Sequence, residues 1–319
     1  MKRFLVILLL ILVIFPAKEL NSWGFHAHKL ANRYAVFTMP EELIGFFKKH
    51  IDHLTEHSVD ADKRRYAVTE EAPRHYIDID AYGENPFEVM PRKWNDAVEK
   101  FTEDTLLAYG IVPWHIQTIY NRLVKAFSDK DVEYILRNAS DLGHYIADAH
   151  VPLHTTLNYD GQLTGQKGIH AFWESRLPEL FSDNYDFLVG SADYRYSVLD
   201  VAWETIEKSH WALDSVLGFE KELSNTFEQD KQYSYEKRGQ KTIKVKSESF
   251  SAAYHEKLNG MVERRLRQSV KAIGDLWYSA WMDAGQPILD GMKESANPFE
   301  EEIIIDHRIR KKDARGHQY

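Results

Sequence analysis

Apolar residues recur at helical spacing through much of this chain. In the segment 250–284 they return every three or four residues and include Leu258, Met261, Val262, Leu266 and Val270. This period places them on one face of a helix. The same pattern predicts helices over residues 41–50, 94–109, 116–127 and 132–149. Stretches that alternate apolar and polar residues are scarce, so the sequence predicts an all-α, compact, single-domain, multi-helix fold.

The first residues are typical of a secretory signal. Lys2 and Arg3 give a positive start, an apolar run of 12 residues extends from Phe4 to Phe15, and a polar stretch follows. Such a run is too short to cross a bilayer comfortably, although an uncleaved anchor is the alternative. We therefore expect residues 1–22 to be removed, which leaves a secreted or periplasmic protein without a membrane anchor.

The rest of the chain is long enough for one large domain with its own core, expected over residues 23–305. Within it, the segment 224–249 is polar and is predicted to be a surface excursion between helices. The segment 306–319 is charged and nearly devoid of core residues, so we expect a disordered tail. The chain has no cysteine, so no disulfide supports the fold.

The net charge limits the kinds of molecule that the protein is expected to bind. The full sequence carries −9, and removal of residues 1–22, which contribute +2, leaves about −11. An acidic protein lacks the broad basic surface that dominates nonspecific affinity for nucleic acid. This argues against a tight duplex binder and leaves room for an enzyme acting on short or single-stranded substrates. No stable protein partner is implied.

The strongest chemical signal lies between His144 and Glu174. His144 and Asp148 are four residues apart, and so are His170 and Glu174. On a helix this spacing puts two side chains on one face. Imidazole together with carboxylate is a donor set that binds zinc. One such pair is more often an ordinary side-chain contact, but two pairs this close together predict a metal site.

A further histidine follows the first of these pairs. Pro152 is expected to end that helix near Val151, because the residue before a proline disfavours the helical conformation. His154 then lies just past the helix end, where it can turn back toward the same metal ions.

Cleavage after Ser22 would create another ligand. The mature chain would begin Trp-Gly-Phe-His-Ala-His, and the free α-amino group of Trp23 would be a nitrogen donor with its own carbonyl oxygen beside it. His28 follows five residues later, close enough to bind the same ion.

These features together resemble the zinc-dependent phospholipase C and single-strand nuclease superfamily, whose nuclease branch is the fungal and plant S-one/P-one type. The resemblance rests on the N-terminal Trp23 and on the block of His144, Asp148 and His154, and it covers the chain from Trp23 to about Glu179. It implies an all-α fold with three zinc ions in a buried cleft.

The resemblance also implies ligands outside this block. A family histidine, followed by an aromatic residue and then an aspartate, matches His75, Tyr76 and Asp78, so His75 is an expected ligand. The last expected ligand is an earlier aspartate, either Asp60 or Asp62. The spacing to His75 favours Asp60, whereas Asp62 fits the nuclease pattern Asp-x-x-Arg.

The resemblance further implies how the ions share their ligands. One zinc would be held by His75, His144, Asp148 and the aspartate of the Asp60/Asp62 pair, the second by Trp23, His28 and Asp148, and the third by His154, His170 and Glu174. Asp148 would bridge two ions, and a hydroxide held between them would attack phosphorus. Arg65 would stabilise the phosphorane with its forked N–H groups, unless it is a surface arginine. Tyr76 would form an aromatic wall for a base or an acyl glycerol, unless it is a core residue.

The predicted function is a secreted trinuclear-zinc phosphoesterase of the nuclease or 3'-nucleotidase type, acting on single-stranded nucleic acid or nucleotides. The run Asp-Ala-His-Val-Pro-Leu-His and the spacing of Asp62 to Arg65 favour this branch. The alternative is a zinc-dependent phospholipase C acting on phospholipid head groups. Glu174 supports it, because the nucleases typically carry Asp there. The chain also departs from the nucleases in having no cysteine and no Gly-Gly-Asn loop between the two ligand groups. A noncatalytic zinc-binding module is the third hypothesis.

Overall fold

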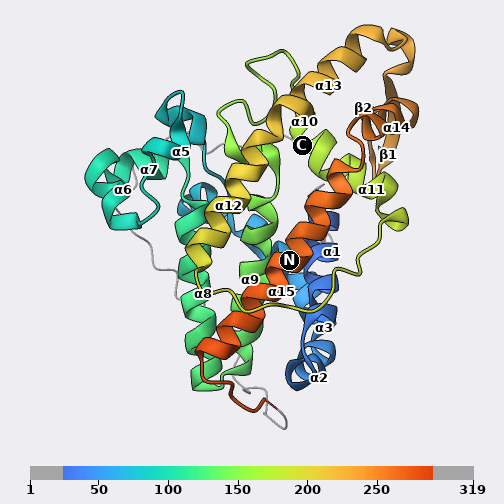
Figure 1. The fold of residues 1–319 in the computed structure, drawn as a ribbon. Coiled ribbons are helices and arrows are strands. Elements are labelled where there is room, and N and C mark those ends of the chain that lie inside the picture. Colours follow the sequence, from blue (N-terminus) through green and yellow to red (C-terminus); the bar gives the residue numbers. More distant parts are fainter. Residues whose placement is uncertain (1–23, 290–319) are drawn as a thin grey trace, which may run out of the picture.

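The computed structural model describes residues 24–289 (Figure 1). The predicted signal segment, Trp23 and the predicted tail 306–319 lie outside these residues. The described chain is helical apart from one two-stranded sheet, which confirms the all-α prediction. In this part of the chain, no helix is long and apolar enough to cross a membrane.

Most elements follow each other with short connections, apart from the loops of residues 156–168 and 185–197. In chain order they are α1 (Phe25–Ala35), α2 (Glu41–Lys49), α3 (Ile51–Glu56), α4 (Asp60–Arg64), α5 (Pro86–Val89), α6 (Trp94–Phe101), α7 (Glu103–Tyr109), α8 (Val112–Asp129), α9 (Val132–Ala149), α10 (Ile169–Ala171), α11 (Leu177–Phe181), α12 (Val198–Trp211), α13 (Leu213–Thr226), β1 (Tyr233–Arg238), β2 (Lys241–Lys246), α14 (Glu248–Lys257) and α15 (Met261–Asp283). Short turns that matter for the site are the 3₁₀ segments η2 (His57–Val59), η3 (Thr69–Arg74) and η5 (Pro152–Thr155) and the π-helical turn η6 (Phe172–Arg176).

Helix α9 forms the centre of the molecule (Figure 1). It packs against α1, α3, α8, α12 and α15, and 15 of its 18 residues are buried. Most of these are apolar and join the main core, as expected of a helix that is covered on all sides. The polar residues of α9 are therefore buried too, and burial without partners is costly. His144 and Asp148 must find partners on neighbouring elements.

Helix α1 approaches α9 closely at Gly143. A Cβ atom at this position would lie 1.9 Å from Asn32 Oδ1. Asn32 is fully buried, and its amide donates hydrogen bonds to the carbonyl oxygens of Leu54 and Ser140 at 3.1 Å each. The missing side chain thus lets α1 lie against α9. This contact brings His28, one turn before Asn32, next to His144.

Gly143→Ala is expected to lower the free energy of unfolding by about 1–3 kcal/mol, because the added methyl group overpacks the contact with Asn32. Urea denaturation of the metal-free protein measures this change. Gly45→Ala in α2 is the matched control, since no atom lies within 4 Å of its added Cβ. The control should be neutral or more stable, as helix propensity favours alanine. Equal stability of the two variants would contradict the tight contact.

The predicted helices are confirmed, except that two of them are each divided in two and that the segment 116–127 belongs to the longer α8. The segment 132–149 coincides with α9, and the extended backbone of Val151 before Pro152 ends the helical path as expected. The segment 250–284 is two helices, because Asn259 and Gly260 adopt left-handed φ values of +48° and +72°. The segment 94–109 is likewise split into α6 and α7 by Thr102. Apolar periodicity continues across both breaks, so the pattern alone missed them.

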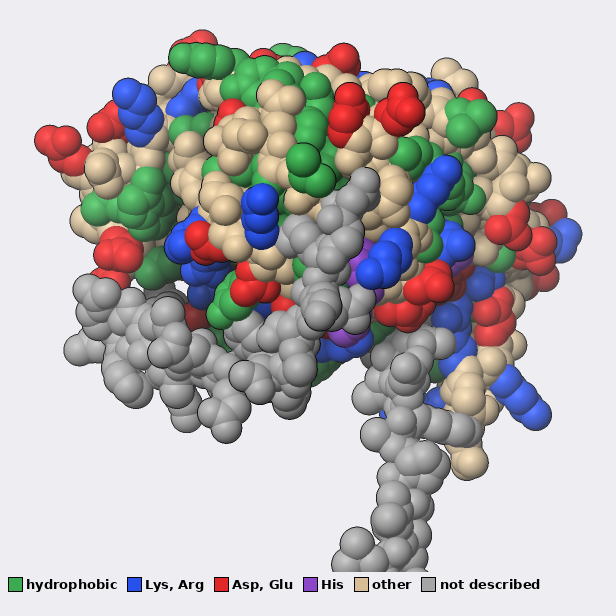
Figure 2. Space-filling view, turned by 90° about the horizontal axis from the view of Figure 1, so that it is seen from below, with side chains coloured by type: hydrophobic (Ala, Val, Ile, Leu, Met, Phe, Trp, Pro, Cys, Tyr) green, Lys and Arg blue, Asp and Glu red, His purple; other side chains and the backbone are tan. Residues whose placement is uncertain are grey.

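Residues 224–249 hold more regular structure than a surface loop. They include the end of α13, the hairpin of β1 and β2, and the start of α14. The strands do not show as an alternating pattern because both faces of this hairpin carry polar residues. On the molecular face in Figure 2, acidic and basic side chains are interspersed, with no broad area of one sign.

Candidate metal centre

Eight of the predicted metal ligands lie within the described residues and come together at one end of α9. They form three groups whose donor atoms lie within 4.8 Å of one another: His28 with His144 and Asp148, Asp62 with His75 and His144, and His154 with His170 and Glu174. His144 belongs to two of the groups. Trp23, the remaining predicted ligand of this set, lies outside the described residues.

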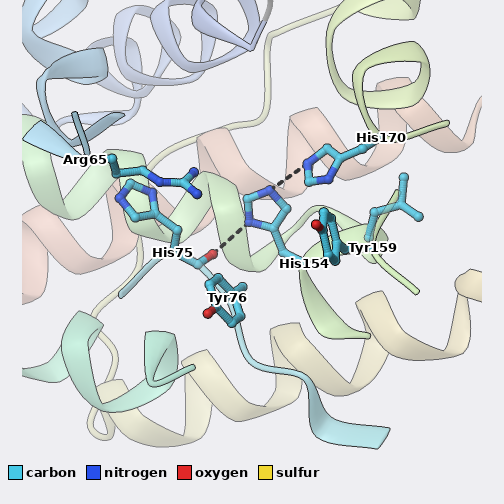
Figure 3. Close-up of a pocket in the computed structure, with 7 residues that line it drawn as sticks. Arg65, His75, Tyr76, His154, Tyr159 and His170 are labelled. Atoms are coloured by element: carbon cyan, nitrogen blue, oxygen red, sulfur yellow. Dashed lines mark hydrogen bonds between the residues drawn. The ribbon is translucent and has the colours of Figure 1, made fainter. Parts of the chain in front are cut away.

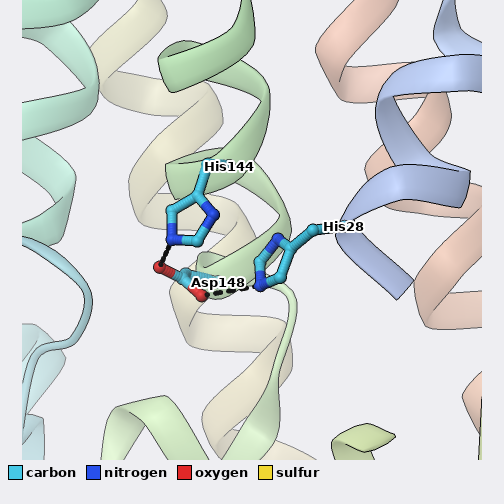
Figure 4. A group of neighbouring side chains, drawn as sticks. All are labelled: His28, His144 and Asp148. Carbon is cyan, nitrogen blue, oxygen red and sulfur yellow. Dashed lines mark ion pairs between the residues drawn. The ribbon is translucent and has the colours of Figure 1, made fainter. Parts of the chain in front are cut away.

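Asp148 occupies the middle of this arrangement. Its Oδ2 atom lies 2.9 Å from His75 Nδ1 and 3.2 Å from His144 Nε2. Its Oδ1 atom lies 3.5 Å from His28 Nε2 and 3.6 Å from His154 Nδ1. Figure 4 shows the carboxylate between the rings of His28 and His144. Because both oxygens face imidazoles from different segments, Asp148 is placed to serve two neighbouring groups.

Glu174 links the third group to the first. Its Oε2 atom lies 2.7 Å from His170 Nε2 and 3.5 Å from His154 Nε2, and its Oε1 atom lies 3.5 Å from His28 Nε2. The spacing of four residues therefore brings the side chains of His170 and Glu174 together, as predicted. The backbone between them passes from α10 into the π-helical turn η6, a geometry that often occurs at functional sites.

Backbone carbonyl groups fix the orientation of two rings. His144 Nδ1–H donates to the Ser58 oxygen at 2.8 Å, and His154 Nδ1–H donates to the His75 oxygen at 2.7 Å (Figure 3). Each bond orients its ring so that Nε2 is directed into the cluster. This is the usual arrangement of metal-ligating histidines.

The negative charges of the buried carboxylates in this centre require positive charges beside them. Burial alone would lower the pKa of His144, but Asp148 and Asp62 outweigh it and raise the pKa to about 9. Burial likewise lowers the pKa of His154, yet Asp148 and Glu174 raise it to about 9. Without metal, protons on imidazoles must therefore balance the buried carboxylates. Metal ions would supply the same positive charge, and the mixed imidazole and carboxylate donors suit them.

The two candidate aspartates of α4 have different surroundings. Asp62 Oδ1 lies 3.8 Å from both His75 Nδ1 and His144 Nε2. The carboxylate of Asp60 instead binds His57 Nδ1 at 2.6 Å and Lys63 Nζ at 2.9 Å. Two residues on a helix point about 200° apart, so only one of them can face the cluster. The structure brings Asp62 into the centre and leaves Asp60 outside it.

A small pocket opens beside the cluster, lined by Arg65, His75, Tyr76, Leu153, His154, Tyr159 and His170 (Figure 3). Arg65 and Tyr76, both singled out from the sequence, are part of its wall. Arg65 Nη1 lies 3.9 Å from Asp62 Oδ1. Tyr159 was not predicted from the sequence. Its position as an aromatic residue in the loop between the two ligand pairs could have indicated it. The pocket offers a guanidinium and two phenol rings next to the metal ligands.

Glu71 is a buried carboxylate behind the cluster that the sequence reasoning missed. It is 1% exposed, its Oε1 atom lies 3.6 Å from His75 Nε2, and it accepts a hydrogen bond from Tyr145. Burial opposes its ionisation, but His75, Arg64 and Arg74 hold the pKa of Glu71 far below its ordinary value. Glu71 and His75 are four residues apart, the same spacing that found the other pairs. The carboxylate lies on the Nε2 side of the His75 ring, opposite the Nδ1 atom that faces Asp148.

Glu71→Gln is expected to weaken metal binding by about 10- to 100-fold, because a neutral amide supports the ring of His75 less well. Competition with a chromogenic chelator measures the affinity. Glu70→Gln is the matched control, since Glu70 forms no ion pair with any described residue. If both variants hold metal as tightly as the natural sequence, Glu71 has no part in positioning the ligand.

The three groups could hold metal ions side by side, with shared ligands between them and an open pocket at their edge. Searches with the sequence find no matching protein-family model and no matching curated protein. The support for this centre therefore comes from the geometry and chemistry of its residues.

Proposed function

We propose that this protein is a secreted zinc-dependent phosphoesterase of the phospholipase C and single-strand nuclease superfamily. The observation that carries the proposal is the set of three buried histidine and carboxylate groups beside a pocket with an arginine in its wall. The centre has the donor types that zinc requires, and backbone carbonyl groups orient the rings of His144 and His154 toward the cluster. Bound zinc would supply Lewis acidity toward phosphate oxygens and lower the pKa of water to about 7.

The side chains of the pocket have separate tasks in this proposal. Asp148 and Glu174 hold the three groups together through contacts to histidines of several segments. Arg65 offers planar, forked N–H groups that match two phosphate oxygens. Burial of the ligands limits the access of water to the cluster. A phosphate ester entering the pocket would thus meet positive charge from the arginine at the place where the ligands converge.

Tyr76 and Tyr159 favour nucleic acid or a nucleotide as the substrate. Both rings line the pocket. Of the described residues that line it, Leu153 alone is aliphatic. Aromatic side chains stack on bases of any sequence, which suits a single-strand nuclease or 3'-nucleotidase. A phospholipase C is the second candidate, and Glu174 at the third group is the observation in its favour.

The test uses mature protein that starts at Trp23 and is loaded with zinc. It is incubated with single-stranded DNA, RNA, a 3'-nucleotide and phosphatidylcholine, with and without a chelator. Chelator-sensitive release of nucleotides or of phosphate from the 3'-nucleotide is the expected result. Release of phosphocholine alone would move the protein to the phospholipase branch. Three bound ions without turnover on any substrate would contradict the enzyme and leave a zinc-binding module.

A further inference from the structure

The hairpin of β1 and β2 concentrates positive charge in an acidic protein. Residues 233–246 contain five lysine or arginine residues and one glutamate, a net charge of +4 in a chain of −9. The antiparallel register pairs Tyr233 with Lys246, Tyr235 with Lys244 and Lys237 with Thr242. Directly paired residues share a face of the sheet, so these six side chains lie on one face.

The opposite face, together with Lys246 at the end of β2, fixes the hairpin to the protein. Glu236 accepts a hydrogen bond from Arg176 at 2.9 Å, and Arg238 donates to Glu179 at 2.7 Å. Val245 is buried on the same side. An isolated two-stranded hairpin is marginally stable, so these contacts are what make it a fixed platform.

The outer face combines an exposed ring with lysines. Tyr235 is 74% exposed, and Lys237 and Lys244 are exposed on either side of it. Neither lysine forms an ion pair with a carboxylate of the described residues. Lys244 Nζ instead lies 3.8 Å from the centroid of the Tyr233 ring, a cation–π contact that holds its charge at this surface.

Two connections join the hairpin to the candidate metal centre. Arg176, which binds Glu236, follows Glu174 by two residues in the turn η6. Lys246 binds Glu220 at 2.9 Å, and Glu220 accepts a second hydrogen bond at 2.7 Å from Gln166. Gln166 belongs to the same loop as the pocket residue Tyr159. Figure 1 shows β1 and β2 close to α11 and α14. The hairpin is thus tied to both segments that carry the third group of ligands and the pocket wall.

We propose that the outer face of this hairpin binds single-stranded nucleic acid outside the pocket, with a base stacked on Tyr235 and phosphates bound by Lys237 and Lys244. The inference rests on the proposed function and names its substrate class as a single-stranded polymer. Every base offers a π-face and every nucleotide a negative charge, which an exposed tyrosine between lysines complements. The face carries no exposed aliphatic side chain, so it suits nucleic acid better than a lipid surface.

The test compares two triple variants of the zinc-loaded mature protein. The hairpin variant is Tyr235→Ala with Lys237→Gln and Lys244→Gln. The control variant is Tyr196→Ala with Lys125→Gln and Lys208→Gln, which removes an exposed ring and two exposed charges elsewhere. Fluorescence anisotropy measures binding of a phosphorothioate oligodeoxythymidylate at several salt concentrations. The hairpin variant should bind at least about tenfold more weakly. Its slope of log affinity against log salt should fall by about 1.4, at about 0.7 per lost phosphate contact.

Hydrolysis separates this inference from the proposed function. The hairpin variant should show a raised KM for single-stranded DNA and an unchanged kcat/KM for a 3'-nucleotide, which has no further nucleotides that could contact the hairpin. Oligonucleotide binding equal to that of the control variant would overturn the hairpin proposal even if the protein cleaves DNA. Selective loss of binding to vesicles of phosphatidylserine and phosphatidylcholine would also overturn it. If the natural protein hydrolyses neither nucleotides nor DNA, the proposed function fails, and the binding measurement still decides about the hairpin.

Discussion

Asp148→Asn is expected to abolish most of the proposed phosphoesterase activity. It should also weaken metal binding by more than about 100-fold, which is more than the loss of a residue that only supports a ligand causes. Both oxygens of Asp148 face histidines of the centre, at 2.9–3.6 Å. An amide keeps the shape of the carboxylate but loses its charge and one acceptor oxygen. The metal content of the purified variant and its rate on a 3'-nucleotide measure the two effects.

A matched control must separate lost chemistry from lost folding. Asp275→Asn serves here, because Asp275 is equally buried but lies on α15 and pairs with Lys271 and Arg195. This variant should lose stability while it keeps its metal and its activity per folded molecule. Full metal content in Asp148→Asn would refute the central position that we assign to this carboxylate.

An alanine added before Trp23 is expected to reduce the bound zinc from three ions to two and to lower activity strongly. The predicted ligand is the α-amino group of Trp23, and an extension converts it into a peptide nitrogen that cannot bind zinc. Gly24, the first described residue, already lies against the centre, since a Cβ there would be 3.1 Å from Glu174 Oε1. Metal analysis of the extended and the mature protein measures the difference.

The control for this experiment is an extension at the other end of the chain. An alanine added after Tyr319 should change neither the metal content nor the rate. Three ions in the protein extended before Trp23 would remove the N-terminal amine from the ligand set. Such a result would leave the eight described ligands, which do not depend on cleavage of residues 1–22.

Local features of this protein could be predicted from the sequence because helical geometry is local. The period of apolar residues predicted α9 with its correct bounds. The spacing of four residues predicted that His144 lies beside Asp148 and His170 beside Glu174. Pro152 ended the helical path as expected, because its effect on the preceding residue needs no tertiary contact. The same spacing rule would also have found Glu71 beside His75.

Other features depend on which segments meet in space. Asp62 belongs to the centre and Asp60 does not, because Asp62 lies on the side of α4 that faces α9. The spacing in the sequence allowed either residue. His28 reaches Asp148 because Gly143 lets α1 lie close to α9.

The sequence by itself thus determined the helical class, the central helix and the two pairs of ligands within single segments. Only the tertiary structure decided the choice between Asp60 and Asp62, the pocket beside Tyr159 and the platform made by the hairpin. The physical reason is the range of the interactions. Side chains four residues apart on a helix meet through the backbone, whereas ligands from α1, α4 and α9 meet only when distant helices pack into one core.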